Sequence, residues 1–162
     1  MARGDQPPGH ADEVSMLLSF LDQYREIIIW KIEDLDETQA RWRPALGANS
    51  LLNLLVHLTG VERRWSQQVI AGEQIERDRD AEFGERSETV PEAIDAYRKA
   101  CARTNEIARA MSPDDTCAGD DGYSVRWVLV HLIEEVARHA GHADITRQLL
   151  DGKVGLSPAY RE

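Results

Sequence analysis

The sequence predicts an all-α protein with the architecture of a four-helix bundle. Four stretches of about 20 residues repeat apolar side chains with a helical period, polar breaks separate them, and almost no stretch alternates like a strand. The chain has 162 residues, which fits one domain of ordinary size. We therefore expect a single domain over 10–156, with a mobile tail at 1–9 and a second tail at 157–162.

The first helix is expected to run from about residue 10 to about residue 33, because apolar side chains recur there at the i, i+3, i+4, i+7 spacing. The side chains that define this face are Val14, Leu17, Leu18, Leu21, Tyr24 and Ile28. The stretch 34–49 combines one potential helical turn with Pro44 and Gly47, and we interpret it as a long connector.

The second helix is expected to start after a polar cap at 49–50 and to stop at Gly72. Trp65 on its apolar face, like Trp127 in the fourth helix, is predicted to pack in the core. Residues 73–88 are highly charged and are predicted to form a solvated loop.

The third helix is expected to begin at Thr89, since Pro91 close behind it is tolerated in a first turn. Ser124 can cap the fourth helix, which Gly152 ends. Cys117 lies in the Gly- and Asp-rich loop between these two helices, where it could be exposed.

The charge of the chain excludes some classes of partner. Lys and Arg total 19 against 29 Asp and Glu, for a formal net charge of −10. A duplex-binding surface needs clustered basic side chains, whereas acids are interleaved here, so nucleic acid is not an expected partner. No run approaches the roughly 18 apolar residues of a membrane span. With two cysteines and no secretory signal at the start, the cytoplasm is the expected location.

Three side chains on two of the predicted helices can form a metal site. His57 lies on the apolar face of the second helix, and Glu135 and His139 project from one face of the fourth. A buried carboxylate and imidazole need compensation, which a divalent cation supplies. Three protein ligands would leave coordination positions open for water or substrate, as in catalytic metal sites.

Two simpler interpretations of the same residues stay open. A histidine on an apolar stripe is commonly a core residue with its hydrogen bonds satisfied, and a Glu–His pair at i, i+4 is commonly a surface pair. His131 and His142 extend the face that carries Glu135 and His139, so the spacing alone leaves the choice of ligands ambiguous.

The segments HLTGVERRW and RWVLVHLIEEVARHAGHAD resemble the DinB-like metalloprotein superfamily, and within it the actinobacterial mycothiol transferases. The resemblance covers roughly residues 11–156. EVARHAGHAD is also similar to a segment of mycothiol-dependent maleylpyruvate isomerase. That isomerase is larger and has a second domain that this chain lacks, so its isomerisation is not expected here.

The resemblance implies an up-down-down-up bundle with a long crossover between the second and third helices. It implies a divalent metal, usually zinc with nickel or iron as alternatives, held by the positions that match His57, Glu135 and His139. It further implies a low-molecular-weight thiol, such as mycothiol, that the metal holds as the thiolate for attack on a small electrophile. The candidates to orient these ligands or to contact substrate are His142, His131 and Arg138, and a role as a fourth ligand stays open for His142.

Two functions from other classes stay open beside this metal-dependent S-transferase, whose reaction would serve detoxification or biosynthesis. One is a metal-binding bundle without turnover, in stress response or sensing. The other is a metal-free bundle that serves dimerisation or partner binding. A homodimer is compatible with all three.

Overall fold

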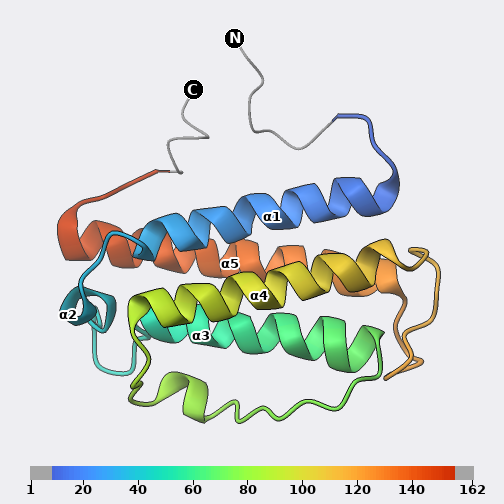
Figure 1. Ribbon diagram of the computed structural model, residues 1–162. Helices are drawn as coiled ribbons and strands as arrows, with labels where there is room; N and C mark the ends of the chain where they lie inside the picture. The colour runs from blue at the N-terminus through green and yellow to red at the C-terminus, as the bar shows by residue number, and fades with distance from the viewer. Residues whose placement is uncertain (1–8, 156–162) are drawn as a thin grey trace.

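The computed structural model describes residues 9–155, and this part of the chain is almost entirely helical. Four long helices pack side by side (Figure 1), which confirms the predicted all-α bundle. They are α1 (Glu13–Ile32), α3 (Leu51–Glu62), α4 (Val90–Arg109) and α5 (Val125–Asp151). The expected tails at 1–9 and 157–162 lie outside the described residues, apart from Gly9. Within 9–155, no helix is both long and apolar enough to cross a bilayer.

Each long helix begins after a short polar residue whose side chain accepts a backbone N–H three residues on. These N-cap residues are Asp12, Ser50, Thr89 and Ser124. The last three are caps that the sequence predicts, whereas the first helix starts a few residues later than expected because Asp12 caps it. Gly152 ends α5 in the left-handed conformation, with φ of 79°.

Ion pairs at both ends show that α1 and α5 run in the same direction. Arg126 at the start of α5 pairs with Glu13 at the start of α1, and Arg147 near the end of α5 pairs with Asp34 just after α1. Figure 1 shows α3 and α4 running the opposite way, with the segment between them returning along the bundle. This order of directions agrees with the up-down-down-up arrangement that the resemblance implies.

Three short elements complete the described chain. The connector after α1 contains the helical turn α2 (Glu37–Ala40), and the crossover contains the 3₁₀ turn η2 (Ala81–Phe83). The second predicted helix continues past Glu62 as the π-helix η1 (Arg63–Ile70), which the apolar spacing does not distinguish from an α-helix. The predicted end at Gly72 is close to this observed end.

Two expectations about burial are wrong. Trp127 is 44% exposed, because the apolar stripe from Val125 to Val136 fills the interior side of α5 and leaves Trp127 at its edge, whereas Trp65 is partly buried and packs against the core. Cys117 is buried, because its loop folds back onto the core and its N–H donates to the carbonyl of Tyr123.

A buried polar cluster joins α1 to α3 and α4. The guanidinium of Arg25 donates to both carboxylate oxygens of Glu62, at 2.8 and 2.6 Å. Thr104 of α4 donates its hydroxyl to the same carboxylate at 2.7 Å. Both charged side chains are buried, so their charges compensate each other in the interior.

Candidate metal centre

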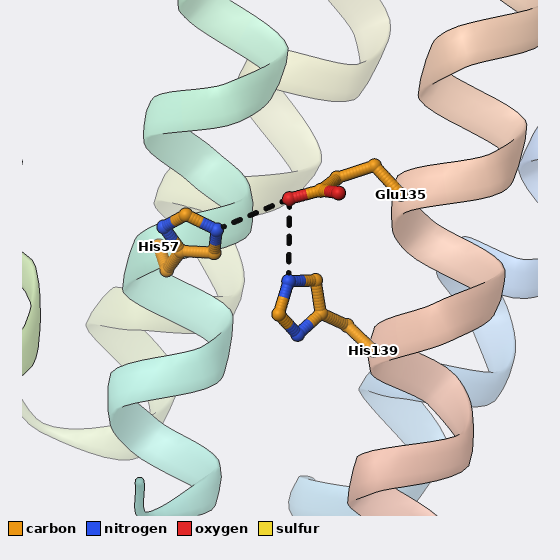
Figure 2. A group of neighbouring side chains, drawn as sticks. All are labelled: His57, Glu135 and His139. Carbon is orange, nitrogen blue, oxygen red and sulfur yellow. Dashed lines mark hydrogen bonds and ion pairs between the residues drawn. The ribbon is translucent and has the colours of Figure 1, made fainter.

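The three predicted ligands meet between α3 and α5. Figure 2 shows His57 on one helix facing Glu135 and His139 on the other, with a carboxylate oxygen between the two rings. Oε1 of Glu135 lies 3.5 Å from Nε2 of His57 and 3.3 Å from Nε2 of His139. His57 and His139 are buried, and Glu135 is partly exposed. The structure therefore brings together residues that lie 78 positions apart in the sequence.

The donor atoms of this group fit a divalent metal ion. One ligand atom from each residue lies within 4.8 Å of the other two. Ligand atoms around a tetrahedral zinc ion, with bonds of about 2.0–2.1 Å, lie about 3.3–3.4 Å apart. The two contacts of Glu135, at 3.5 and 3.3 Å, are close to this separation and are longer than a good N–H···O hydrogen bond of about 2.9 Å. Two imidazoles and a carboxylate also form a donor set that divalent transition metals accept.

Glu82 contacts His57 from the side opposite Glu135. Its Oε2 lies 2.8 Å from Nδ1 of His57. The expectation that 73–88 is simply a solvated loop is wrong at this point, since Glu82 is buried and the Phe83 ring lies 4.9 Å from the imidazole. A histidine that binds a metal through Nε2 commonly donates its Nδ1–H to a carboxylate in this way.

The two carboxylates constrain the protonation of His57. A neutral imidazole has one N–H, and a proton on Nδ1 for Glu82 leaves a lone pair on Nε2. That lone pair faces Oε1 of Glu135, so the arrangement needs a cation between the two atoms or a second proton on the ring. A bound metal satisfies this requirement without charging the imidazole.

Gly60 and Arg77 keep Glu82 in place. Arg77 donates from Nε and from a terminal nitrogen to the two Glu82 oxygens, at 2.6 and 2.9 Å. Gly60 lies one turn after His57 on α3, and a Cβ added there would lie 2.2 Å from Oε1 of Glu82 and 2.8 Å from Nε of Arg77. The bare backbone of Gly60 thus provides the room in which this ion pair reaches His57.

The pKa values of the site favour the protonation states that bind a metal. Burial raises the pKa of Glu135, but its interactions with His139, Arg138 and His57 outweigh burial and hold that pKa below its ordinary value. Burial likewise opposes ionisation of Glu82, and the hydrogen bonds from Arg77 and His57 reverse the effect on its pKa. Burial lowers the pKa of His139, although Glu135 partly opposes it. Ionised carboxylates and a neutral imidazole are the forms that act as ligands.

The three remaining candidates lie in different surroundings. His142 borders the centre, with its Nδ1 3.4 Å from Nδ1 of His139. Arg138 pairs with Oε2 of Glu135 at 2.5 Å, so the group that its guanidinium contacts is one of the three candidate ligands. His131 contacts tryptophans instead of the centre: its ring is stacked on Trp127 with ring centroids 5.1 Å apart.

Sequence reasoning missed Glu82, Arg77 and Gly60. A buried histidine in need of an acceptor for Nδ1 was the available signal, but the crossover offers several acids without helical spacing. Which of them reaches His57 depends on the path of the crossover across α3.

The fold and the centre together define a class: helical bundles with a histidine–carboxylate site between two helices. A DinB-like protein of Bacillus subtilis has the same fold, with a TM-score of 0.66 at 15% identity over 90% of this chain and 99% of that one. A conserved protein of Enterococcus faecalis matches with a TM-score of 0.65 at 16% identity, over 89% and 100%. At these identities the likeness shows the fold alone.

The sequence profile of the mycothiol-S-transferase family matches residues 16–152. The chain belongs to this family, which confirms the resemblance seen in the sequence. A comparison with functionally curated proteins finds no match.

Proposed function

We propose that this protein is a metal-dependent thiol S-transferase that joins mycothiol, or a similar low-molecular-weight thiol, to a small electrophile. The observation that carries the proposal is the convergence of His57, Glu135 and His139, with donor separations that suit a divalent cation. Family membership supports the thiol, and zinc is the first candidate metal, with nickel and iron as alternatives.

The residues of the centre would hold the ion and leave part of its coordination sphere open. His57, Glu135 and His139 supply three ligands, which leaves room for a further one. A divalent cation bound there would lower the pKa of a thiol from about 8.5 and favour the thiolate. Glu82 orients the His57 ring through Nδ1, and Arg138 orients the Glu135 carboxylate through Oε2.

The chain itself need not supply the nucleophile. Both cysteines have raised pKa values, mainly because burial disfavours their thiolates. Neither cysteine is therefore activated as a thiolate nucleophile, which agrees with a reaction in which the external thiol attacks the electrophile.

The first test measures metal content together with thiol-dependent loss of an electrophile. The purified protein is assayed with mycothiol and chlorobimane, beside His57→Ala, Glu135→Ala and His139→Ala. His131→Ala is the matched control, because it removes a histidine of the same helix that contacts Trp127 instead of the centre. We expect stoichiometric metal and activity in the native protein and the control, and loss of both in the three variants.

Two results would overturn the proposal. Bound metal without thiol-dependent turnover, with several electrophiles tried, would indicate a sensing or storage bundle. Absence of metal even after addition of zinc, nickel or iron would identify the cluster as ordinary bundle packing and remove the basis for thiol activation.

A further inference from the structure

A hollow of about 280 Å³ lies beside the candidate metal centre. Its walls are the connector 44–49, Leu54 of α3 and the turn 142–146 of α5. Leu54 precedes His57 by three residues and His142 follows His139 by three. Leu54 and His142 therefore each lie about one helical turn, or about 5 Å along the helix, from a candidate ligand.

The lining of this hollow carries no Asp, Glu, Lys or Arg among the described residues. Apolar groups dominate it, including Leu54 and Ile145. The other large hollows differ: one between α3 and the crossover is lined by Arg63 and Arg77 with several acids, and another contains three arginines. In a chain with 30% charged residues, an uncharged wall beside a charged centre favours an uncharged, largely apolar ligand.

His142 presents an N–H at this wall. Nδ1 of His139 lies 3.4 Å from Nδ1 of His142, and with a metal ion on its Nε2 a neutral His139 would carry its proton on Nδ1 and donate it to His142. A neutral His142 then carries its own proton on Nε2. Within the described residues this Nε2–H has no hydrogen-bond partner, and the side chain is exposed and lines the hollow.

We propose that this hollow binds the uncharged, largely apolar part of the electrophile, and that His142 donates its Nε2–H to an electronegative atom of that molecule. The inference rests on the proposed transferase function, which it deepens. In the reaction, the thiol sulfur forms a bond to the electrophilic carbon. With an epoxide, the C–O bond breaks and its electron pair stays on the oxygen; with an unsaturated carbonyl compound, the C=C π pair shifts so that the charge develops on the carbonyl oxygen. In both cases the proton released by the thiol is taken up by that oxygen. An N–H directed at this oxygen stabilises the charge that develops on it.

The proposal is tested by binding, independently of turnover. Benzamide, an unreactive and uncharged probe that carries an acceptor oxygen, is titrated into the full metal-loaded chain and followed by heteronuclear NMR. We expect it to shift the signals of residues 44–49 and 142–146. Ile145→Asp places a charge on the wall at a side chain that is 58% exposed, and should weaken binding about tenfold or more.

Leu149→Asp is the matched control, because Leu149 is 62% exposed on the same helix, one turn beyond Ile145, and does not line the hollow. It should leave benzamide affinity within about twofold. The proposal is overturned if benzamide shifts no signals of the hollow, or if the two aspartate variants weaken binding equally.

The role of His142 is tested with His142→Ala and His142→Gln, with metal content measured in both. The alanine variant should lose about three- to tenfold in benzamide affinity, the glutamine variant should retain most of it through its amide N–H, and both should keep the metal. Loss of metal in either variant would identify His142 as a ligand and overturn its assignment as a donor.

These measurements separate the two proposals. Benzamide binding with the expected variant effects, but without thiol-dependent turnover, would support the hollow and overturn the transferase. Turnover with metal in place, but without benzamide binding at the hollow, would support the transferase and overturn the proposed role of the hollow.

Discussion

The carboxylate of Glu82 lies 2.8 Å from Nδ1 of His57, although the two residues are 25 positions apart and belong to the crossover and to α3. This contact makes the crossover part of the candidate metal centre. It fixes which nitrogen of His57 is available to an ion, because a proton held on Nδ1 leaves Nε2 free.

Glu82→Gln is expected to weaken metal binding without abolishing it. The amide oxygen can still accept the Nδ1–H, but the negative charge that makes His57 a better ligand is lost. We expect the metal dissociation constant, measured by competition with a chelator, to rise by about 10- to 100-fold. Glu85→Gln, three residues away and exposed, is the control and should not change it. Equal affinities for both variants would show that Glu82 does not act on the centre.

Gly60→Ala is expected to lower metal affinity while leaving the metal-free fold intact. The new Cβ would displace the side chains of Glu82 and Arg77, which approach it within 2.2 and 2.8 Å. Alanine is favoured over glycine within a helix by about 1 kcal/mol, which offsets the cost of moving two flexible side chains. The measurements are metal affinity and urea unfolding of the metal-free protein.

Gly141→Ala provides the comparison, because it also replaces a helical glycine but its Cβ would meet no atom within 4 Å. It should raise stability slightly and leave metal affinity unchanged. If Gly60→Ala behaves in the same way, the space at Gly60 is not needed by the Glu82–Arg77 pair.

Glu62→Gln is expected to destabilise the fold by about 3 kcal/mol, because it leaves the buried charge of Arg25 without its main partner. The double variant Arg25→Met with Glu62→Leu removes both charges and should cost less than the single change. Free energies of unfolding in urea measure both. A single variant within about 0.5 kcal/mol of the native protein would contradict this account.

Asp34→Asn is expected to lower the free energy of unfolding at neutral pH, and this difference from the native protein should shrink in acid. Hydrogen bonds from Arg147, and secondarily from Lys153, lower the pKa of Asp34 from 3.8 to about 2, although burial opposes this. A folded-state pKa below the unfolded value stabilises the fold above about pH 4, and that contribution disappears as the pH falls from 4 towards 2. The side chain is 51% exposed, so after allowance for solvent screening we expect a loss of about 1 kcal/mol at pH 7.

The check is urea unfolding of Asp34→Asn and native protein at pH 7 and near pH 2.5, where their difference should shrink. Asp95→Asn is the control, because its pair with Lys99 is exposed on both sides and should contribute little at either pH. A difference that is constant with pH would mean that the charge of Asp34 is not responsible.

Local signals in the sequence determined the helices and their ends. The caps Ser50, Thr89 and Ser124 and the terminator Gly152 were predictable because each acts on backbone groups within a few residues. Helical spacing also placed His57, Glu135 and His139 on interior faces, but it left His131 and His142 as further candidates, and it was the resemblance to a known family that selected the three residues that converge. The π geometry of η1 was not, because a π-helix and an α-helix share similar apolar spacing over two turns.

Tertiary structure alone decided what lies around the three candidate ligands. Glu82 reaches His57, Trp127 lies at the edge of α5 and Cys117 is buried because of how the crossover, helices and loops pack against one another. None of these positions follows a period, and several charged residues of the crossover offered the same chemistry as Glu82. Periodicity tells which face of a helix is buried, whereas contacts made by an irregular segment depend on its path through space.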